Sequence, residues 1–461
     1  MSITLDALPI EILEEILIVS DPIEVGMVSC CSRFFYNLVY NSSGNSSQHL
    51  WRALYLAQPF DDPTICVSQT GRPRIGEFDW KSELQAIIRA RTVLCDVSIC
   101  KPLERIQVLR TLLHMVCWVP PLRSYNDIIG NTSQNLLWVA AVTRGGIFLD
   151  SDKIGLSSDD PVLAEEEAQL RARLHTIIGI TPADNKPPSR LAARAYIYNM
   201  RHYNWANEFG PFLPTSTEGN GTGRVNWVHI KHIHHSITMH MLELADDTAF
   251  EVVIYPLSFP FTQIIIPEGM DLDQEEDWAG VNGEWTVSFC FVDHSLLLRY
   301  NNISDPETGG LRVSLLADPI FQEMFRSMTV RLQVTNVKED PNHPGRPRIY
   351  FLGAVEQSPD GSPTINGYVC MTDDDQIRWH FVSGEQGQAI WSSEGIQVGG
   401  LRSSYGVLVS NECSFNMFGP VHQLQDIQGS WTTIFHDEDD PVGPFWLRKV
   451  PSRNPEPETA V

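Results

Sequence analysis

The spacing of apolar and polar residues divides the chain into an N-terminal part with helical periods and a C-terminal part of short alternating segments. Near the N-terminus, Ile12, Leu13, Ile16 and Leu17 fall at i, i+1, i+4 and i+5, so they share one side of a helix. Three glutamates of the same stretch lie on the opposite side. The pattern predicts a short amphipathic helix that begins near Pro9, because proline suits the first turn of a helix.

A second helix has a clear start signal. Asp21 can cap it, Pro22 suits its first position, and Glu24 has the spacing of a capping box. Apolar residues then continue at helical spacings, and after the polar insert 41–47 the helical pattern resumes at Leu50. Three or four short helices within about fifty residues cannot bury a sufficient core alone. We therefore expect part of their apolar surface to pack against another element or another protein.

The middle of the chain continues the helical pattern. Residues 135–142 form a short buried segment that fits either a helix or a strand. Helices are predicted at residues 80–94, 103–118, 165–177 and 191–199.

Residues 227–244 combine a helical apolar stripe with several histidines. His229, His232, His240 and Glu243 share a neighbouring face, and imidazole and carboxylate groups are the usual nitrogen and oxygen ligands of zinc. His232 and His240 lie about 12 Å apart along a helix axis, so one ion cannot bind all four residues. These four residues are metal candidates only as half-sites. Histidines at the boundary between core and solvent are the alternative, and no cofactor is predicted.

Beyond residue 249 the period changes to that of β-strands. The predicted segments are short, rich in β-branched and aromatic residues, and separated by turn residues. They indicate an antiparallel sandwich or barrel, so the predicted fold class is α+β. The chain after residue 441 is rich in turn residues. The predicted strands are residues 250–255, 286–292, 296–300, 311–316, 330–335, 348–355, 367–371, 377–382 and 406–409.

Tryptophans are concentrated in this C-terminal part. In a barrel mouth they would stack on a ligand or contact a bound protein, whereas in the core they would fill volume. The candidates for substrate contact are Trp278, Trp285, Trp379 and Trp391.

Composition narrows the function class. The 461 residues carry a formal charge of −24, from 57 acidic and 33 basic side chains, which disfavours nucleic acid and anionic membranes as partners. The nine cysteines show no Cys-x-x-Cys spacing, which argues against a disulfide framework and favours a reducing compartment. The sequence has neither a signal-peptide pattern nor an apolar run long enough for a membrane span. We expect the protein in the cytosol or the nucleus.

Catalytic patterns are missing from the sequence. Asp293, His294 and Ser295 are the residue types of a catalytic triad, but in the expected strand successive side chains would point to opposite faces. The glycine-rich segment 219–223 lacks the lysine and the strand–helix context of a phosphate-binding loop. We therefore predict that the chain is not an enzyme.

The N-terminal pattern resembles the F-box. The stretch Leu8-Pro9-Ile10-Glu11-Ile12-Leu13 matches the start of that motif, and Asp21-Pro22, Val28 to Leu38, and His49-Leu50-Trp51-Arg52 follow in the family's order. The sequence departs from the family at Ser32, where a cysteine usually precedes the basic residue, and in the insert 41–47. The resemblance implies docking on a Skp-type adaptor, and through it on a cullin. The adaptor-binding residues that it implies, as contacts or as supports for contacts, are Leu8, Pro9, Ile12, Leu13, Ile16, Leu17, Val25, Val28, Leu50 and Trp51.

Further blocks resemble a large group of F-box proteins from mushroom-forming fungi, a resemblance that implies no known chemistry. Those blocks are residues 193–198, 210–214, 225–229, 277–281 and 391–400, together with Trp285.

The expected organisation is an F-box at 1–56, a mainly helical middle at 57–248, a β-domain at 249–450 and a flexible tail at 451–461. The expected function is that of a substrate receptor, which presents an unknown bound protein to a cullin-RING ubiquitin ligase. The alternative is a small-molecule-binding β-barrel whose N-terminal helices serve a structural or ligand-controlled interaction role.

Overall fold

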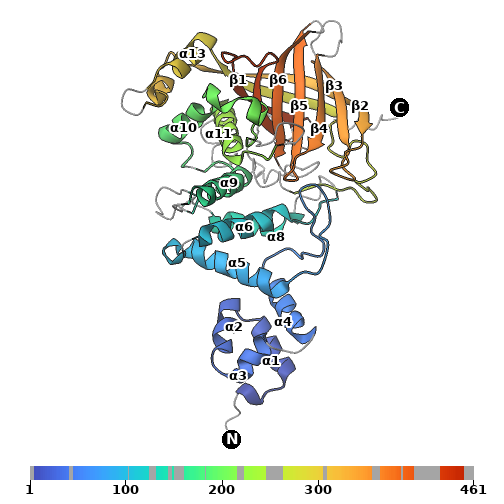
Figure 1. The fold of residues 1–461 in the computed structure, drawn as a ribbon. Coiled ribbons are helices and arrows are strands. Elements are labelled where there is room, and N and C mark those ends of the chain that lie inside the picture. The colour runs from blue at the N-terminus through green and yellow to red at the C-terminus, as the bar shows by residue number, and fades with distance from the viewer. Residues whose placement is uncertain are drawn as a thin grey trace, which may run out of the picture. The chain divides into compact units, whose positions relative to one another are not determined.

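Two compact units make up the chain (Figure 1). Unit 1 comprises Met1–Val67, Pro73–Pro120 and Ser133–Glu167, and unit 2 comprises Ser68–Arg72, Pro121–Thr132 and Ala168–Val461. No helix in the part of the chain that is described is both long and apolar enough to cross a membrane. The computed structural model describes residues 5–40, 45–101, 103–123, 131–143, 148–149, 160–181, 183–214, 223–244, 263–304, 309–355, 364–385, 388–398 and 426–450.

Unit 1 begins with the predicted N-terminal helices, α1 (Ile10–Ile18), α2 (Pro22–Ser29), α3 (Arg33–Tyr40) and α4 (Asn45–Leu56), after a turn of 3₁₀ helix, η1 (Leu5–Ala7). Asp21 caps α2, since its side chain accepts a hydrogen bond from the backbone N–H of Ile23. Leucines of α1, α3 and α4 form a small core between the helices. Its fully buried members include Leu13, Leu17, Leu38, Leu50 and Leu54.

The rest of unit 1 is also helical, with α5 (Trp80–Cys95), η2 (Val97–Ile99), α6 (Glu104–Cys117) and α8 (Gln134–Thr143). The segment 135–142 is therefore a helix. The buried carboxylate of Asp61 accepts hydrogen bonds from the backbone N–H groups of Gln134 and Asn135, at the start of α8, where helical N–H groups lack partners. Helix α9 (Pro161–Ile178) crosses the boundary between the two units.

Unit 2 contains a closed antiparallel barrel in which each strand pairs with the next along the chain, and the last pairs with the first. The β-domain is thus a barrel and not a sandwich. Its strands are β1 (Gly283–Val292), β2 (Glu323–Lys338), β3 (Arg348–Val355), β4 (Ile365–Met371), β5 (Ile377–Glu385), β6 (Gln388–Val398), β7 (Asp426–Thr433) and β8 (Gly443–Lys449).

Aromatic rings fill the middle of the barrel. The Trp285 ring on β1 lies 5.3 Å from the Trp379 ring on β5, and these strands are not neighbours, so the contact crosses the interior. The Phe351 ring lies 5.5 Å from Trp379. Glycine makes room for a neighbouring ring, since a Cβ atom added at Gly367 would lie 2.6 Å from Cζ of Phe351. The barrel interior is a packed core.

Helix α11 (Trp227–Leu244) covers part of the barrel's outer face, and helix α10 (Pro187–Ile197) packs against α11. Isoleucines of α11 pack against the outward side chains of β1, β6 and β8, and together they form a second core. Both helices fall within the expected middle region 57–248, but they group with unit 2. The residues in contact include Ile230, Ile233, Ile237, Cys290, Val292, Ile396, Val398 and Trp446.

Several strand predictions were wrong. Residues 296–300 lie in a helix, α13 (His294–Asn302), because Asp293 caps it by accepting from the N–H groups of Ser295 and Leu296. Residues 311–316 fall largely in a 3₁₀ helix, η9 (Val313–Ala317).

Other strands were missed. Strands β6 and β7 were not predicted, and β8 lies where a turn-rich chain was expected. From Ser392 to Val398 both faces of β6 are buried, so this part of the strand has no exposed face to produce an alternating pattern. The predicted strands 250–255 and 406–409, the glycine-rich segment 219–223 and the tail 451–461 lie outside the described residues.

Candidate functional site

Apolar side chains on α1 and α2 remain exposed. On α1 and at its C-terminal cap, Ile12, Ile16 and Val19 lie at i, i+4 and i+7, on one face, and are 49%, 41% and 83% exposed. On α2, Ile23 and Met27 lie at i and i+4 and are 41% and 60% exposed. We call these five residues the N-terminal apolar residues. Large apolar side chains gathered on consecutive short helices are typical of an interaction surface.

The ten residues expected to bind an adaptor differ in burial. Trp51 is buried, and its Nε1 donates a 3.0 Å hydrogen bond to the carbonyl of Val39. Pro9, Ile12 and Ile16 are exposed, Leu8 and Val28 are half-buried, and Leu13, Leu17, Val25, Leu50 and Trp51 are buried.

Val19, Ile23 and Met27 were missed as candidates for contact. The sequence of α2, Pro22 to Ser29, places apolar residues on all sides of the helix, so its pattern does not tell which face is exposed. The structure buries Val25 and leaves Ile23 and Met27 open.

An ion pair fixes the start of α2 to α5 within unit 1. Nη2 of Arg91 lies 2.8 Å from Oδ1 of Asp21. The hydrogen bond from Arg91 is the main reason why the pKa of Asp21 is lowered. Helix α2, which carries Ile23 and Met27, is thus linked to the longer helix α5.

The histidines of α11 lie in different surroundings. His229 is buried, and its Nε2 lies 3.2 Å from the hydroxyl of Tyr203, whereas the His232 ring stacks on Tyr196 at 4.6 Å. Burial lowers the pKa of both histidines to about 3, so they are neutral at physiological pH. Within the described residues neither joins a group of three metal-ligating side chains. The side chain of Glu243 lies outside the described residues.

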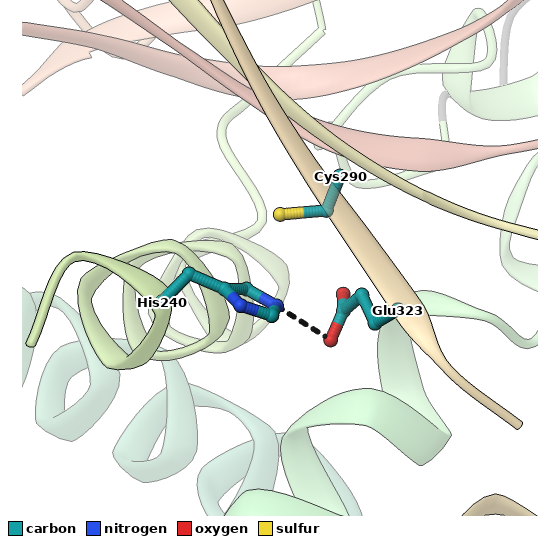
Figure 2. Close-up of side chains that lie close together, drawn as sticks. All are labelled: His240, Cys290 and Glu323. Carbon is teal, nitrogen blue, oxygen red and sulfur yellow. Dashed lines mark ion pairs between the residues drawn. The ribbon is translucent and has the colours of Figure 1, made fainter. Parts of the chain in front are cut away.

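His240 faces two partners that its own helix does not supply (Figure 2). Its Nε2 lies 2.9 Å from Oε2 of Glu323, the first residue of β2. The thiol of Cys290, on β1, points toward the same space, and the ligand atoms of the three residues lie within 4.8 Å of one another. Sequence reasoning paired His240 with Glu243 and missed both partners, because barrel strands far along the chain bring them to α11.

A cleft of about 1050 Å³ opens beside this group, between α10, α11 and the chain that leads from η9 into β2. The cleft is large enough for a small organic molecule or a peptide side chain. Its lining includes Arg190, Arg194, His235, His240, Phe321 and Glu323.

Three of the four tryptophan candidates lie in the core. Trp278, Trp285 and Trp379 are 0% exposed, and the Nε1 of Trp285 donates a 2.8 Å hydrogen bond to the carbonyl of Val281. Trp391 is 37% exposed and packs against Trp431 at 5.2 Å. Of the four, only Trp391 offers a surface that another molecule can reach.

Asp293, His294 and Ser295 form no triad. Asp293 caps α13 and hydrogen-bonds the hydroxyl of Ser295, while Nε2 of His294 lies 2.6 Å from the carbonyl oxygen of Asp439. The imidazole is therefore engaged away from the serine, and Asp293 and Ser295 form the N-terminal cap of a helix.

Comparison with protein-family models, with curated proteins and with solved structures found no match to this chain.

Proposed function

We propose that this protein is an F-box substrate receptor, which docks on a Skp-type adaptor through α1 and α2 and presents a bound protein to a cullin-RING ubiquitin ligase. One observation carries the proposal. The helices that bear the F-box-like motif keep Ile12, Ile16, Val19, Ile23 and Met27 exposed while their leucines form a core.

The energy of docking would come from covering these side chains. Full burial of one isoleucine or methionine contributes roughly 1.5–3 kcal/mol. Ile12 and Ile16, each about half exposed, would together contribute roughly 1.5–3 kcal/mol, which corresponds to roughly 10- to 100-fold in affinity. Polar contacts around them would add specificity.

The buried half of the motif would hold this surface in shape. Leu13 and Leu17 anchor α1, and Trp51 ties α4 to the end of α3 through its bond to Val39. Docking onto a surface held in its bound conformation loses less entropy than docking a segment that must first fold.

Unit 2 would supply the surface that holds the target. The rings of Trp285, Trp379 and Phe351 pack together inside its barrel, so a small molecule at the centre would have to displace them. Target contacts would therefore come from outward side chains, from loops and from the end of the barrel, where Trp391 is a partly exposed candidate on the inward face of β6. Such a receptor needs no catalytic group, because its contribution is the effective concentration of the target near the ligase.

Affinity capture with the full chain tests the proposal. We compare the unaltered protein with the double variant Ile12→Glu/Ile16→Glu and with Ile75→Glu as a matched control. Ile75 is also in unit 1, is 96% exposed, and lies outside the motif. Mass spectrometry should find the Skp-type adaptor and a cullin with the unaltered protein and with Ile75→Glu. The double variant should lose both.

Thermal unfolding must accompany the capture. Substitutions at exposed positions change the free energy of unfolding by about 0.5 kcal/mol or less, so all three proteins should unfold at similar temperatures. Failure to capture the adaptor with any of the three, or equal capture by all of them, would contradict the proposal.

A further inference from the structure

His240, Cys290 and Glu323 bring three different ligand types to one point from three elements. His240 lies on α11, Cys290 on β1 and Glu323 at the start of β2, and their ligand atoms lie within 4.8 Å of one another (Figure 2). We propose that these three side chains bind one zinc ion. The inference does not depend on adaptor docking, since it concerns unit 2 alone.

The donor set suits zinc. Thiolate sulfur, imidazole nitrogen and carboxylate oxygen are its three protein ligand types, and three such ligands leave the fourth tetrahedral position for water. Hard cations such as magnesium and calcium prefer oxygen ligands alone, so the thiol and the imidazole disfavour them. One Zn²⁺ with a cysteine thiolate and a glutamate carboxylate is formally neutral, which lowers the cost of burying the ion here.

Neighbouring side chains already hold the carboxylate of Glu323 in a ligating orientation. Its Oε1 accepts hydrogen bonds from the Tyr198 hydroxyl at 2.5 Å and from the Ser236 hydroxyl at 3.2 Å. Its Oε2 faces His240 at 2.9 Å, and Nε of Arg194 lies 3.4 Å away. Metal-ligating carboxylates are typically oriented by hydrogen bonds of this kind, here those from Tyr198 and Ser236 to Oε1. The zinc ion would bind Oε2 and displace Arg194 from it.

The site also has an access path. His240 and Glu323 both line the cleft of about 1050 Å³, so an ion and its water can reach them from solvent. Cys290 is 0% exposed, behind them. A reactive cysteine must be accessible to its substrate, so this burial argues against a cysteine–histidine nucleophile.

The test measures metal binding by the full chain. The protein is stripped with a chelator and dialysed, and zinc is titrated in competition with a chromophoric chelator. We expect one zinc per chain. Cys290→Ser and His240→Ala should each weaken binding by at least about tenfold, a loss typical of removing one element of a metal site. Cys370→Ser and His232→Ala are the matched controls and should bind like the unaltered protein. Cys370 is buried on β4, and His232 lies on the same helix as His240.

The cobalt spectrum of the unaltered protein tests the site even where a variant fails to fold. Co²⁺ bound by a thiolate gives a charge-transfer absorption band in the near ultraviolet. The unaltered protein and Cys370→Ser should show this band, and Cys290→Ser should lack it. The proposal is overturned if the unaltered protein binds no stoichiometric zinc. It is also overturned if its cobalt form lacks the thiolate band, or if all four variants bind zinc as well as the unaltered protein.

Discussion

The N-terminal helices of unit 1 and the barrel of unit 2 differ in how much of their apolar side chains they bury. The N-terminal helices leave Ile12, Val19 and Met27 in solvent and have little core of their own. The barrel closes on aromatic rings, and charges on its outer face are also buried, such as Arg378 at 2% exposure and Glu394 at 6%. The barrel thus has a core of its own, whereas the N-terminal helices leave apolar surface that a second protein would cover.

The largest expected effect comes from the buried charges of unit 2. Arg378 lies 2.7 Å from a carboxylate oxygen of Glu208 and 2.9 Å from one of Glu394, and Nδ1 of His380 lies 2.6 Å from the same oxygen of Glu394. Arg378→Met would leave the Glu394 carboxylate buried without its main counter-charge. We expect it to lower the free energy of unfolding by about 3–5 kcal/mol. Urea unfolding followed by tryptophan fluorescence measures this change.

Arg326→Met is the matched control for Arg378→Met, because Arg326 is an exposed residue of β2. Its effect should stay within about 0.5 kcal/mol. If both variants unfolded at the same urea concentration, the buried Arg378 would not stabilise unit 2. That result would contradict the expected loss of stability in Arg378→Met.

A change in pH should have an intermediate effect on the free energy of unfolding. Burial lowers the pKa of His229 and of His234 to about 3 in the folded chain, against about 6.5 when unfolded. Below pH 6.5 the unfolded chain therefore binds protons that the folded chain does not, so stability is present above that pH and falls as the pH drops toward 3. At pH 4.5 the loss should be roughly 1–3 kcal/mol per histidine.

The variant His234→Gln isolates this pH effect. It should lose less stability than the unaltered protein between pH 7 and pH 4.5, as measured by urea unfolding at both pH values. His49→Gln, at an exposed position of α4, should keep the full pH dependence. An unchanged pH dependence in His234→Gln would show that His234 is not held neutral by burial.

The smallest expected effect concerns glycine. Gly26 lies inside α2, and a Cβ atom added there would meet nothing within 4 Å. Gly26→Ala should therefore stabilise the chain by about 0.5–1 kcal/mol, from helix propensity alone. Gly429→Ala on β7 should destabilise it, because the added Cβ would lie 2.0 Å from the carbonyl oxygen of Glu394. Thermal unfolding of both variants gives the two signs, and equal signs would contradict the contrast between an open helix and a packed barrel.

Sequence patterns predicted the parts of the fold in which one face of an element meets solvent. Helices α1, α5 and α6 show clear helical periods, and β3 and β5 show strand patterns. Strand β6 was missed because both of its faces are buried from Ser392 to Val398, so no alternation marks that part. The short apolar run of α13 fits a strand as well as a helix, and the cap at Asp293 decides between the two.

The candidate site was predictable only where its residues are neighbours in sequence. The motif at residues 8–52 placed Ile12 and Ile16 on one helix face, but it could not separate them from the buried Leu13 and Leu17, which share that side. His240 was a candidate, yet Cys290 and Glu323 come from barrel strands whose pairing depends on long-range contacts. No pattern of neighbouring residues in the sequence predicts that these three side chains lie close together.

The account is tested most directly by the dissociation constant of the full chain for a purified Skp-type adaptor. We expect the unaltered protein to bind, Ile75→Glu to bind with the same affinity, and Ile12→Glu/Ile16→Glu to bind roughly 10- to 100-fold more weakly while it unfolds at the same temperature. Equal affinity for all three proteins, or no binding by the unaltered chain, would contradict the claim that the exposed side chains of α1 form a docking surface.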